Sequence, residues 1–152
     1  MDTDKQVQIL QMAYAGALAD AVFQFNKENI LERVIERKRQ EQIISGKIRA
    51  AQFGITTPEE VFLRLSQIFN CAQWHITDQP NGGFNAQAVS CKLCAIARKI
   101  GAPSPCHLYC LDPMEGMIRA VKNDAAFLVE ETLWDGTQCR INVRYNNQIS
   151  CI

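Results

Sequence analysis

The sequence lacks an excess of charge of either sign and any long apolar run. It contains 16 Lys or Arg and 16 Asp or Glu among 152 residues, so no overall positive field exists to hold nucleic acid. The most apolar stretch, Met12 to Phe25, is interrupted by Asp20 and is too short to span a bilayer. The first residues, MDTDKQ, carry acids where a secretory signal has a basic region. We therefore expect a cytoplasmic protein with neither nucleic-acid nor membrane partners.

Cysteine, by contrast, is abundant. The chain has seven, an odd number that excludes a complete set of intramolecular disulfides. In a reducing compartment such residues serve as metal ligands, catalytic thiols or small core residues. Within twenty residues lie Cys91, Cys94, Cys106 and Cys110, with His107 among them and Asp112 shortly after. The functional site is therefore expected within residues 85–145. Cys71 and His75 are interpreted as core or surface residues, and Cys151 as incidental.

Residues 1–70 are predicted to form the helical half of a single domain, 1–152. One helix covers the start of the chain, a break falls at residues 26–29, and a charged second helix follows. Thr57 and Pro58 are a capping hydroxyl and a first-turn proline, which begin a third helix. A helical apolar stripe is formed by Val7, Leu10, Tyr14, Ala17 and Ala21. We expect this stripe to pack in the core, and the N-terminal helices to support a homo-oligomer.

Residues 71–152 form a cysteine-rich half with strands. Short strands are predicted at 72–77 and 84–90, a helix at 91–100, and another from Asp112, with its carboxylate as the cap, to about Lys122. Two alternating segments, 126–134 and 137–145, flank Asp135-Gly136, a strong two-residue hairpin signal. The predicted fold is α+β, with N-terminal helices packed on a small antiparallel sheet that ends in a C-terminal β-hairpin.

The hairpin register makes a specific prediction for Glu130. A two-residue turn pairs Glu131 with Arg140 and places Glu130 opposite Ile141. The Glu130 carboxylate then points to the inward face that carries Cys139. Since a buried, unpaired carboxylate is unfavourable, Glu130 is expected to be partnered or to act as a general base with a raised pKa.

The spacing of the cysteines leaves several interpretations open. Cys91-x-x-Cys94 followed by Cys106-x-x-x-Cys110 resembles a metal site, with His107 as an alternative ligand. A Cys-x-x-Cys pair at a helix start is also typical of redox proteins. Alternatively, Cys91 opens a helix whose dipole lowers the pKa of its thiol, which favours a nucleophile. It is equally compatible with a small buried core residue.

Three segments carry a resemblance to a known family, namely Ala88-Val89-Ser90-Cys91 with Gly101, Leu108-Tyr109-Cys110-Leu111-Asp112, and Thr132-Leu133-Trp134-Asp135-Gly136-Thr137-Gln138-Cys139. They resemble the L-2-amino-thiazoline-4-carboxylic acid hydrolase family. Its pattern has a V-T-x-C cysteine, a glycine ten residues on, a cysteine closely followed by aspartate, and a T-x-x-x-G-x-x-C-x-F hairpin. Cys94 and Cys106 are additions to this pattern, and Ile141 or Val143 replaces the aromatic residue after the last cysteine. The helical half with a Cys-ending hairpin is also similar, more weakly, to vinyl-4-reductase-like small-molecule-binding domains.

The resemblance implies a cysteine-dependent hydrolase, without a cofactor, of a carbon–nitrogen bond in a small cyclic amidine such as 2-aminothiazoline-4-carboxylate. Cys91 would attack or orient the amidine carbon, and Asp112 or Glu130 would move protons. An arginine would hold the substrate carboxylate. The remaining site residues, expected to contact substrate, are Cys110, Cys139 and His107.

The alternative function is a non-enzymatic binding or sensor domain. It would hold a small molecule, zinc or an iron–sulfur centre on Cys91, Cys94, Cys106 and Cys110. In either case we expect Cys91, Cys110, Asp112 and Cys139 to converge on one pocket, with Cys91 as the most reactive thiol.

Overall fold

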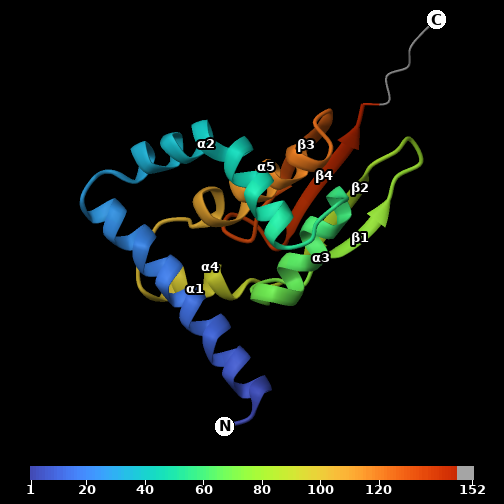
Figure 1. The fold of residues 1–152 in the computed structure, drawn as a ribbon. Coiled ribbons are helices and arrows are strands. Elements are labelled where there is room, and N and C mark those ends of the chain that lie inside the picture. Colours follow the sequence, from blue (N-terminus) through green and yellow to red (C-terminus); the bar gives the residue numbers. More distant parts are fainter. Residues whose placement is uncertain (147–152) are drawn as a thin grey trace, which may run out of the picture.

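The computed structural model describes residues 1–146, so Cys151 lies outside the described residues. The helices are α1 (Thr3–Lys27), α2 (Leu31–Gln52), α3 (Pro58–Phe69), α4 (Lys92–Lys99), the π-helix η1 (His107–Leu111) and α5 (Asp112–Val121). The strands are β1 (His75–Asp78), β2 (Phe84–Ala88), β3 (Ala125–Glu131) and β4 (Cys139–Tyr145). Figure 1 shows helices and a small sheet in one α+β fold, as predicted. No helix within residues 1–146 has the length and apolarity needed to cross a membrane.

The sheet has the strand order β1-β2-β4-β3, and each neighbouring pair is antiparallel. The last strand, β4, therefore lies inside the sheet, between β2 and β3. Alternate side chains of β2 and β4 face the helices, as the period-two pattern predicts. The buried residues on this face are Phe84, Ala86, Ala88, Cys139, Ile141 and Val143. They form the main core together with residues of α3 and α5.

The helical half begins as predicted, but a different stripe of α1 is buried. Asn29, with φ of 59°, separates α1 from α2. Val7, Leu10 and Tyr14 are exposed, with exposed fractions from 44% to 68%. The buried residues of α1 are Ala15, Ala19 and Val22. Of these, Ala19 and Val22 belong to a second core that includes residues of α2 and α4. The prediction that the Val7–Ala21 stripe packs in the core is therefore wrong, because small residues are what the close approach of α4 requires.

Helices α2 and α5 pack closely against each other. A Cβ atom built on Gly46 would lie 2.2 Å from the carbonyl oxygen of Gly116. A Cβ atom on Gly116 would in turn lie 2.5 Å from the carbonyl oxygen of Gln42. Glycine at both positions therefore lets the two backbones touch, and this contact fixes α5 along α2 beside the cysteine segment (Figure 1).

The C-terminal hairpin is wider than the Asp135-Gly136 turn predicts. Strand β3 ends at Glu131 and β4 begins at Cys139, so residues 132–138 form the connection. The carboxylate of Glu131 accepts hydrogen bonds from the backbone amides of Thr137 at 2.8 Å and Gln138 at 3.3 Å. These bonds close a longer loop in place of the two-residue turn, so the prediction of a tight turn is wrong.

The wider loop is accompanied by a β-bulge at Glu130. Glu131 pairs with Arg140 as predicted, but Val129, not Glu130, pairs with Ile141. The bulge removes Glu130 from the ladder and shifts the rest of β3 by one residue. The predicted inward placement of Glu130 is consequently wrong.

Candidate functional site

A cavity of about 420 Å³ lies between the two cores. Its wall is contributed by α1, the end of α2, α3, the segment after α3, the start of α4, η1, α5 and β4. The wall is mostly apolar, but it contains every cysteine of residues 1–146. These are Cys71, Cys91, Cys94, Cys106, Cys110 and Cys139. The prediction that Cys91, Cys110 and Cys139 converge is confirmed, and Cys71, interpreted from sequence as a bystander, joins them.

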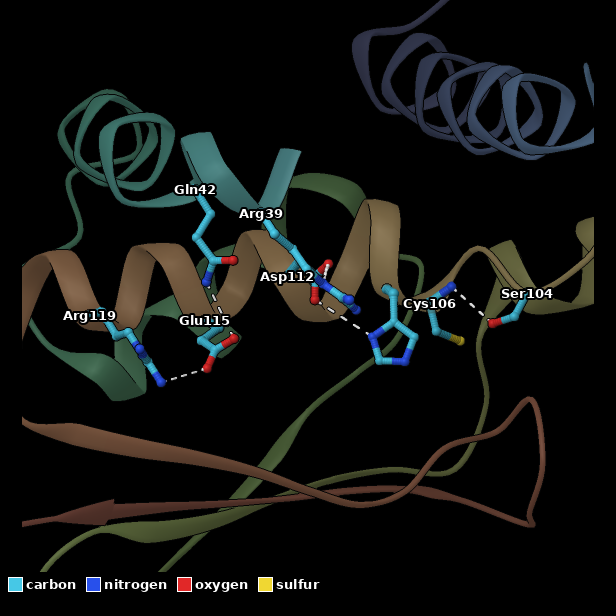
Figure 2. A network of polar contacts seen from close by, with 8 residues as sticks. Arg39, Gln42, Ser104, Cys106, Asp112, Glu115 and Arg119 are labelled. Carbon is cyan, nitrogen blue, oxygen red and sulfur yellow. Dashed lines mark hydrogen bonds and ion pairs between the residues drawn. The ribbon is translucent and has the colours of Figure 1, made fainter. Parts of the chain in front are cut away.

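Asp112 does not line this cavity. Its carboxylate accepts a hydrogen bond from Arg39 Nε at 2.8 Å, and its other oxygen lies 3.6 Å from His107 Nδ1. Figure 2 shows the Arg39 side chain reaching from α2 to Asp112 at the start of α5. Because η1 continues into α5 without interruption, Asp112 lies inside a helical run and does not cap it. The expected convergence of Asp112 on the pocket and its capping role are therefore wrong.

His107 also lies outside the cavity wall, in the same ion cluster as Asp112. Its imidazole side chain is 55% exposed. A group this exposed, and directed at Asp112, is not placed to contact a molecule inside the cavity. The expectation that His107 contacts substrate there is thus not met.

Glu130 is part of a surface ion pair. One carboxylate oxygen lies 2.9 Å from Arg140 Nε, and the two side chains are 37% and 39% exposed. The N–H of Arg140 is not directed at that oxygen well enough to make a hydrogen bond, so the contact is an ion pair. Glu130 does not reach the cavity. Because the bulge removes Glu130 from the inward face of the strand, it is not a buried general base.

Cys91 has the geometry of an activated thiol. It is the N-cap of α4, and its sulfur accepts a hydrogen bond from the backbone amide of Cys94 at 3.4 Å. A hydrogen bond from the Cys94 side chain is the main cause that lowers the pKa of Cys91 to about 6, and burial opposes it. The backbone amides of Cys94 and Leu93 lower the pKa further. These hydrogen bonds therefore favour the thiolate form of Cys91.

Two further thiols adjoin Cys91. The sulfurs of Cys94 and Cys106 lie 3.7 Å apart, and both residues are buried. The shared hydrogen bond lowers the pKa of Cys106 and raises that of Cys94 far above its ordinary value. Cys94 is therefore the protonated donor, with a sulfur neighbour on either side. A single S–H group donates to only one of them at a time.

The other three cysteines are kept protonated by their surroundings. Burial raises the pKa of Cys71 and that of Cys110, and raises the pKa of Cys139 to about 11. The sulfur of Cys139 accepts a hydrogen bond from the backbone amide of Leu133 at 3.3 Å. Their thiols are thus weak nucleophiles at neutral pH, and they line the cavity as uncharged groups.

Among residues 1–146, one basic side chain lines the cavity, that of Arg49 near the end of α2. None of the ion pairs found within residues 1–146 involves Arg49. A guanidinium with free donors in an apolar wall is well suited to a carboxylate. The sequence predicts an arginine for this task but does not indicate which, because nothing in α2 distinguishes Arg49 from the other basic residues.

The last turn of α4 is tied to the hairpin loop through Arg98. Its guanidinium lies over the Trp134 ring, 4.3 Å from the ring centre, and donates to the Trp134 carbonyl oxygen. Stacking of this kind stabilises the pair by roughly 0.5–2 kcal/mol. It holds the helix that presents Cys91 against the loop that precedes Cys139.

The metal interpretation has no geometric support. Across residues 1–146, no three His, Cys, Asp or Glu side chains come together in an arrangement that could hold a metal ion. Cys94 and Cys106 are adjacent, but Cys91 and Cys110 do not complete a ligand set with them. The zinc or iron–sulfur alternative therefore rests on sequence spacing alone.

No family model, curated protein or solved structure matches the chain. The resemblance to the L-2-amino-thiazoline-4-carboxylic acid hydrolase family consequently stays a prediction.

Proposed function

We propose that the protein is a cysteine-dependent enzyme that takes a small, largely apolar molecule bearing a carboxylate. The observation that carries this proposal is the joint presence of Cys91 and Arg49 in one apolar cavity. Arg49 holds the carboxylate by charge-assisted hydrogen bonds. Cys91, with a pKa of about 6, then meets an electrophilic carbon as a thiolate.

The reaction proposed is hydrolysis of a carbon–nitrogen bond in a cyclic amidine such as 2-aminothiazoline-4-carboxylate. The Cys91 sulfur forms a bond to the amidine carbon, and the electron pair of the C=N bond moves to nitrogen. An amidine that binds in its protonated form supplies the proton for this step. The carbon–nitrogen bond then breaks and the amine leaves. Water, deprotonated by that amine, cleaves the carbon–sulfur bond and frees the Cys91 thiol.

A second candidate, a binding domain without catalysis, is favoured by one observation. Among residues 1–146, no carboxylate or imidazole lines the cavity. Water activation then depends on the substrate's own nitrogen, since no side chain of the described wall is an obvious general base. If that activation fails, the same cavity binds the molecule and releases it unchanged.

The test combines binding and turnover with L-2-aminothiazoline-4-carboxylate. Tryptophan fluorescence reports binding, because Trp74 lines the cavity, and mass spectrometry reports hydrolysis. Cys91→Ala should bind but not hydrolyse. Arg49→Met should weaken binding by roughly 10- to 100-fold, the loss expected for a hydrogen-bonded charge. The control Lys47→Met changes an exposed residue of the same helix and should leave both readouts unchanged.

The outcomes separate the two candidates. Hydrolysis by the unchanged protein that is lost in Cys91→Ala supports the enzyme. Binding that depends on Arg49, without hydrolysis, supports the binding domain. If the compound does not bind, or binds equally well to Arg49→Met, the proposed carboxylate site is wrong.

A further inference from the structure

Cys94 and Cys106 form no bond to the substrate in the proposed hydrolysis, yet their position is specific. Cys94 lies at the start of α4 and Cys106 directly before η1. Their sulfurs are 3.7 Å apart, and the Cys91 sulfur accepts a hydrogen bond from the Cys94 amide. All three residues line the same cavity. Three thiols thus share the wall of one cavity, and the sulfurs of two of them are in contact.

We propose that Cys91, Cys94 and Cys106 form a thiol relay that reduces a hydroperoxide in the cavity and stores the oxidation as a Cys94–Cys106 disulfide. The relay goes beyond the proposed hydrolysis and is independent of it, because it requires neither an amidine nor Arg49.

Each step of the relay balances. The Cys91 thiolate attacks the distal oxygen of the hydroperoxide, the O–O bond breaks, and Cys91 sulfenic acid and an alkoxide form. The alkoxide takes a proton and leaves as the alcohol. The Cys94 sulfur then displaces the sulfenic hydroxyl, and a Cys91–Cys94 disulfide and water result. Finally Cys106 attacks the Cys94 sulfur, the new disulfide forms, and Cys91 leaves as a thiolate. Two thiols are oxidised, and the hydroperoxide is reduced to an alcohol and water.

The geometry favours Cys94–Cys106 as the final disulfide. The two sulfurs need to approach from 3.7 Å to the roughly 2.05 Å of a disulfide bond. Rotation of two side chains achieves this when the backbone positions allow it. In addition, the pKa of Cys106 is lowered first by the hydrogen bond with Cys94 and further by Ser104. The Ser104 contribution remains when Cys94 has entered a disulfide, and it favours Cys106 as the attacking thiol. Cys94 contacts Cys106 through its sulfur and Cys91 through its backbone amide, which makes it the middle member of the relay.

The cavity also indicates the class of hydroperoxide. Its wall is mostly apolar, with aromatic and aliphatic side chains around the thiols. An organic hydroperoxide with an apolar body gains from burial there, whereas hydrogen peroxide does not. Both compounds oxidise a thiolate by cleavage of their O–O bond, so the rate of thiol oxidation distinguishes the organic hydroperoxide from hydrogen peroxide. An external dithiol is the reductant that returns the protein to its thiol form.

The experiment treats the fully reduced full-length protein with one equivalent of cumene hydroperoxide or of hydrogen peroxide. Remaining thiols are blocked with N-ethylmaleimide, and disulfides are mapped by peptide mass. The unchanged protein should yield the Cys94–Cys106 disulfide and an equal amount of alcohol, faster with cumene hydroperoxide. Cys106→Ser should stop at Cys91–Cys94. Cys94→Ser should give no disulfide in this set and leave a Cys91 sulfenic acid that dimedone traps.

Two further variants complete the test. Cys91→Ser should slow disulfide formation by roughly tenfold, because the most reactive thiolate is lost. Cys71→Ser changes another cysteine of the cavity wall and should still give the Cys94–Cys106 disulfide. Circular dichroism of each variant establishes that it is folded. The relay is refuted by the absence of a Cys94–Cys106 disulfide in the unchanged protein, by an unchanged rate in Cys91→Ser, or by a dominant disulfide that involves Cys71 or Cys110.

Discussion

The backbone amide of Cys94 donates a hydrogen bond to the sulfur of Cys91 over 3.4 Å. This contact makes a cysteine, in place of the usual Ser, Thr, Asp or Asn, the N-cap of α4. The positive end of the helix dipole and the neighbouring Cys94 thiol both favour negative charge on the sulfur. One local arrangement thus begins a helix and activates a thiol.

The first prediction concerns the order in which the cysteines react. The pKa of Cys91 is lowered to about 6 and that of Cys139 is raised to about 11. Because the thiolate is the reacting form, labelling of Cys91 should rise as the pH increases through about 6 and be nearly maximal at neutral pH. Limited alkylation with iodoacetamide, read by peptide mass at several pH values, measures this. Prior labelling of Cys139 or Cys71 at neutral pH would contradict it.

The second prediction tests the cause of that activation. Cys94→Ala removes the S–H donor but keeps the backbone amide. Since hydrogen bonds to charged groups contribute about 1.5–3 kcal/mol, the pKa of Cys91 should rise by about 1–2 units. The pH midpoint of Cys91 alkylation measures the change. Cys71→Ala is the matched control, because Cys71 lines the same cavity but does not donate to Cys91. An equal shift in both variants would assign the effect to the cavity in general.

The third prediction concerns Asp112. Its side chain is 11% exposed and accepts a hydrogen bond from Arg39 at 2.8 Å, so Asp112→Asn should lower the free energy of unfolding by about 1–2 kcal/mol. The exposed pair Arg37–Glu41 provides the control, and Glu41→Gln should change stability by no more than about 0.5 kcal/mol. Urea denaturation measures both.

The same variant separates structure from catalysis. If Asp112 links α2 to α5 and does not act on substrate, folded Asp112→Asn keeps its amidine binding and any turnover. Loss of turnover in a variant with normal urea stability would restore the catalytic interpretation that the sequence suggests.

The sequence predicts the elements of this fold well, because their signals are local. The Thr57 cap, the break before α2 and the alternation in β4 each depend on a few neighbouring residues. The hairpin turn is predicted wrongly for a physical reason of another kind. Asp135-Gly136 favours a tight turn locally, but the Glu131 carboxylate binds amides six and seven residues ahead and stabilises a wider loop. The tight turn that the local sequence favours therefore does not form, because side-chain hydrogen bonds that no sequence pattern reveals stabilise the wider loop.

In the candidate site, too, some features follow from a sequence motif and others depend on packing that the sequence does not reveal. The convergence of Cys91, Cys110 and Cys139 is predictable from a motif, whereas Cys71 and Arg49 enter the wall only because α2 and α3 end beside it. The prediction that Asp112 lines the pocket is wrong because its partner, Arg39, lies far away in sequence and the sequence does not reveal the pairing. Long-range pairing of charges is decided by helix packing, and hydrophobic periodicity does not reveal it.

The fourth prediction concerns the two glutamates at the end of β3. A two-residue turn would make Glu130 the more important of them, whereas the observed loop gives that role to Glu131. Glu131→Gln removes the charge that binds two loop amides, and the low pKa of Glu131 comes first from its hydrogen bond with Thr137. Glu130→Gln disturbs only a surface ion pair. Glu131→Gln should therefore lower the melting temperature more than Glu130→Gln, and the difference should shrink at low pH, where Glu131 becomes protonated. Thermal denaturation followed by circular dichroism at neutral and acidic pH measures both. A larger effect of Glu130→Gln would show that the bulge is misplaced.

The last prediction uses two glycines of the helical half that differ only in their surroundings. At Gly46 a Cβ would lie 2.2 Å from the Gly116 carbonyl oxygen, a backbone atom that cannot move without separating α2 from α5. Gly46→Ala should therefore destabilise the protein by about 2–3 kcal/mol, as overpacked cores do. At Gly16 in α1 a Cβ meets no atom within 4 Å. Gly16→Ala should instead stabilise the protein by about 0.5–1 kcal/mol, through the better helix propensity of alanine. Urea denaturation of the two variants measures opposite signs. If Gly46→Ala leaves the free energy of unfolding unchanged, α2 and α5 do not touch at this position. The Asp112–Arg39 ion pair between the same two helices would then be wrong as well.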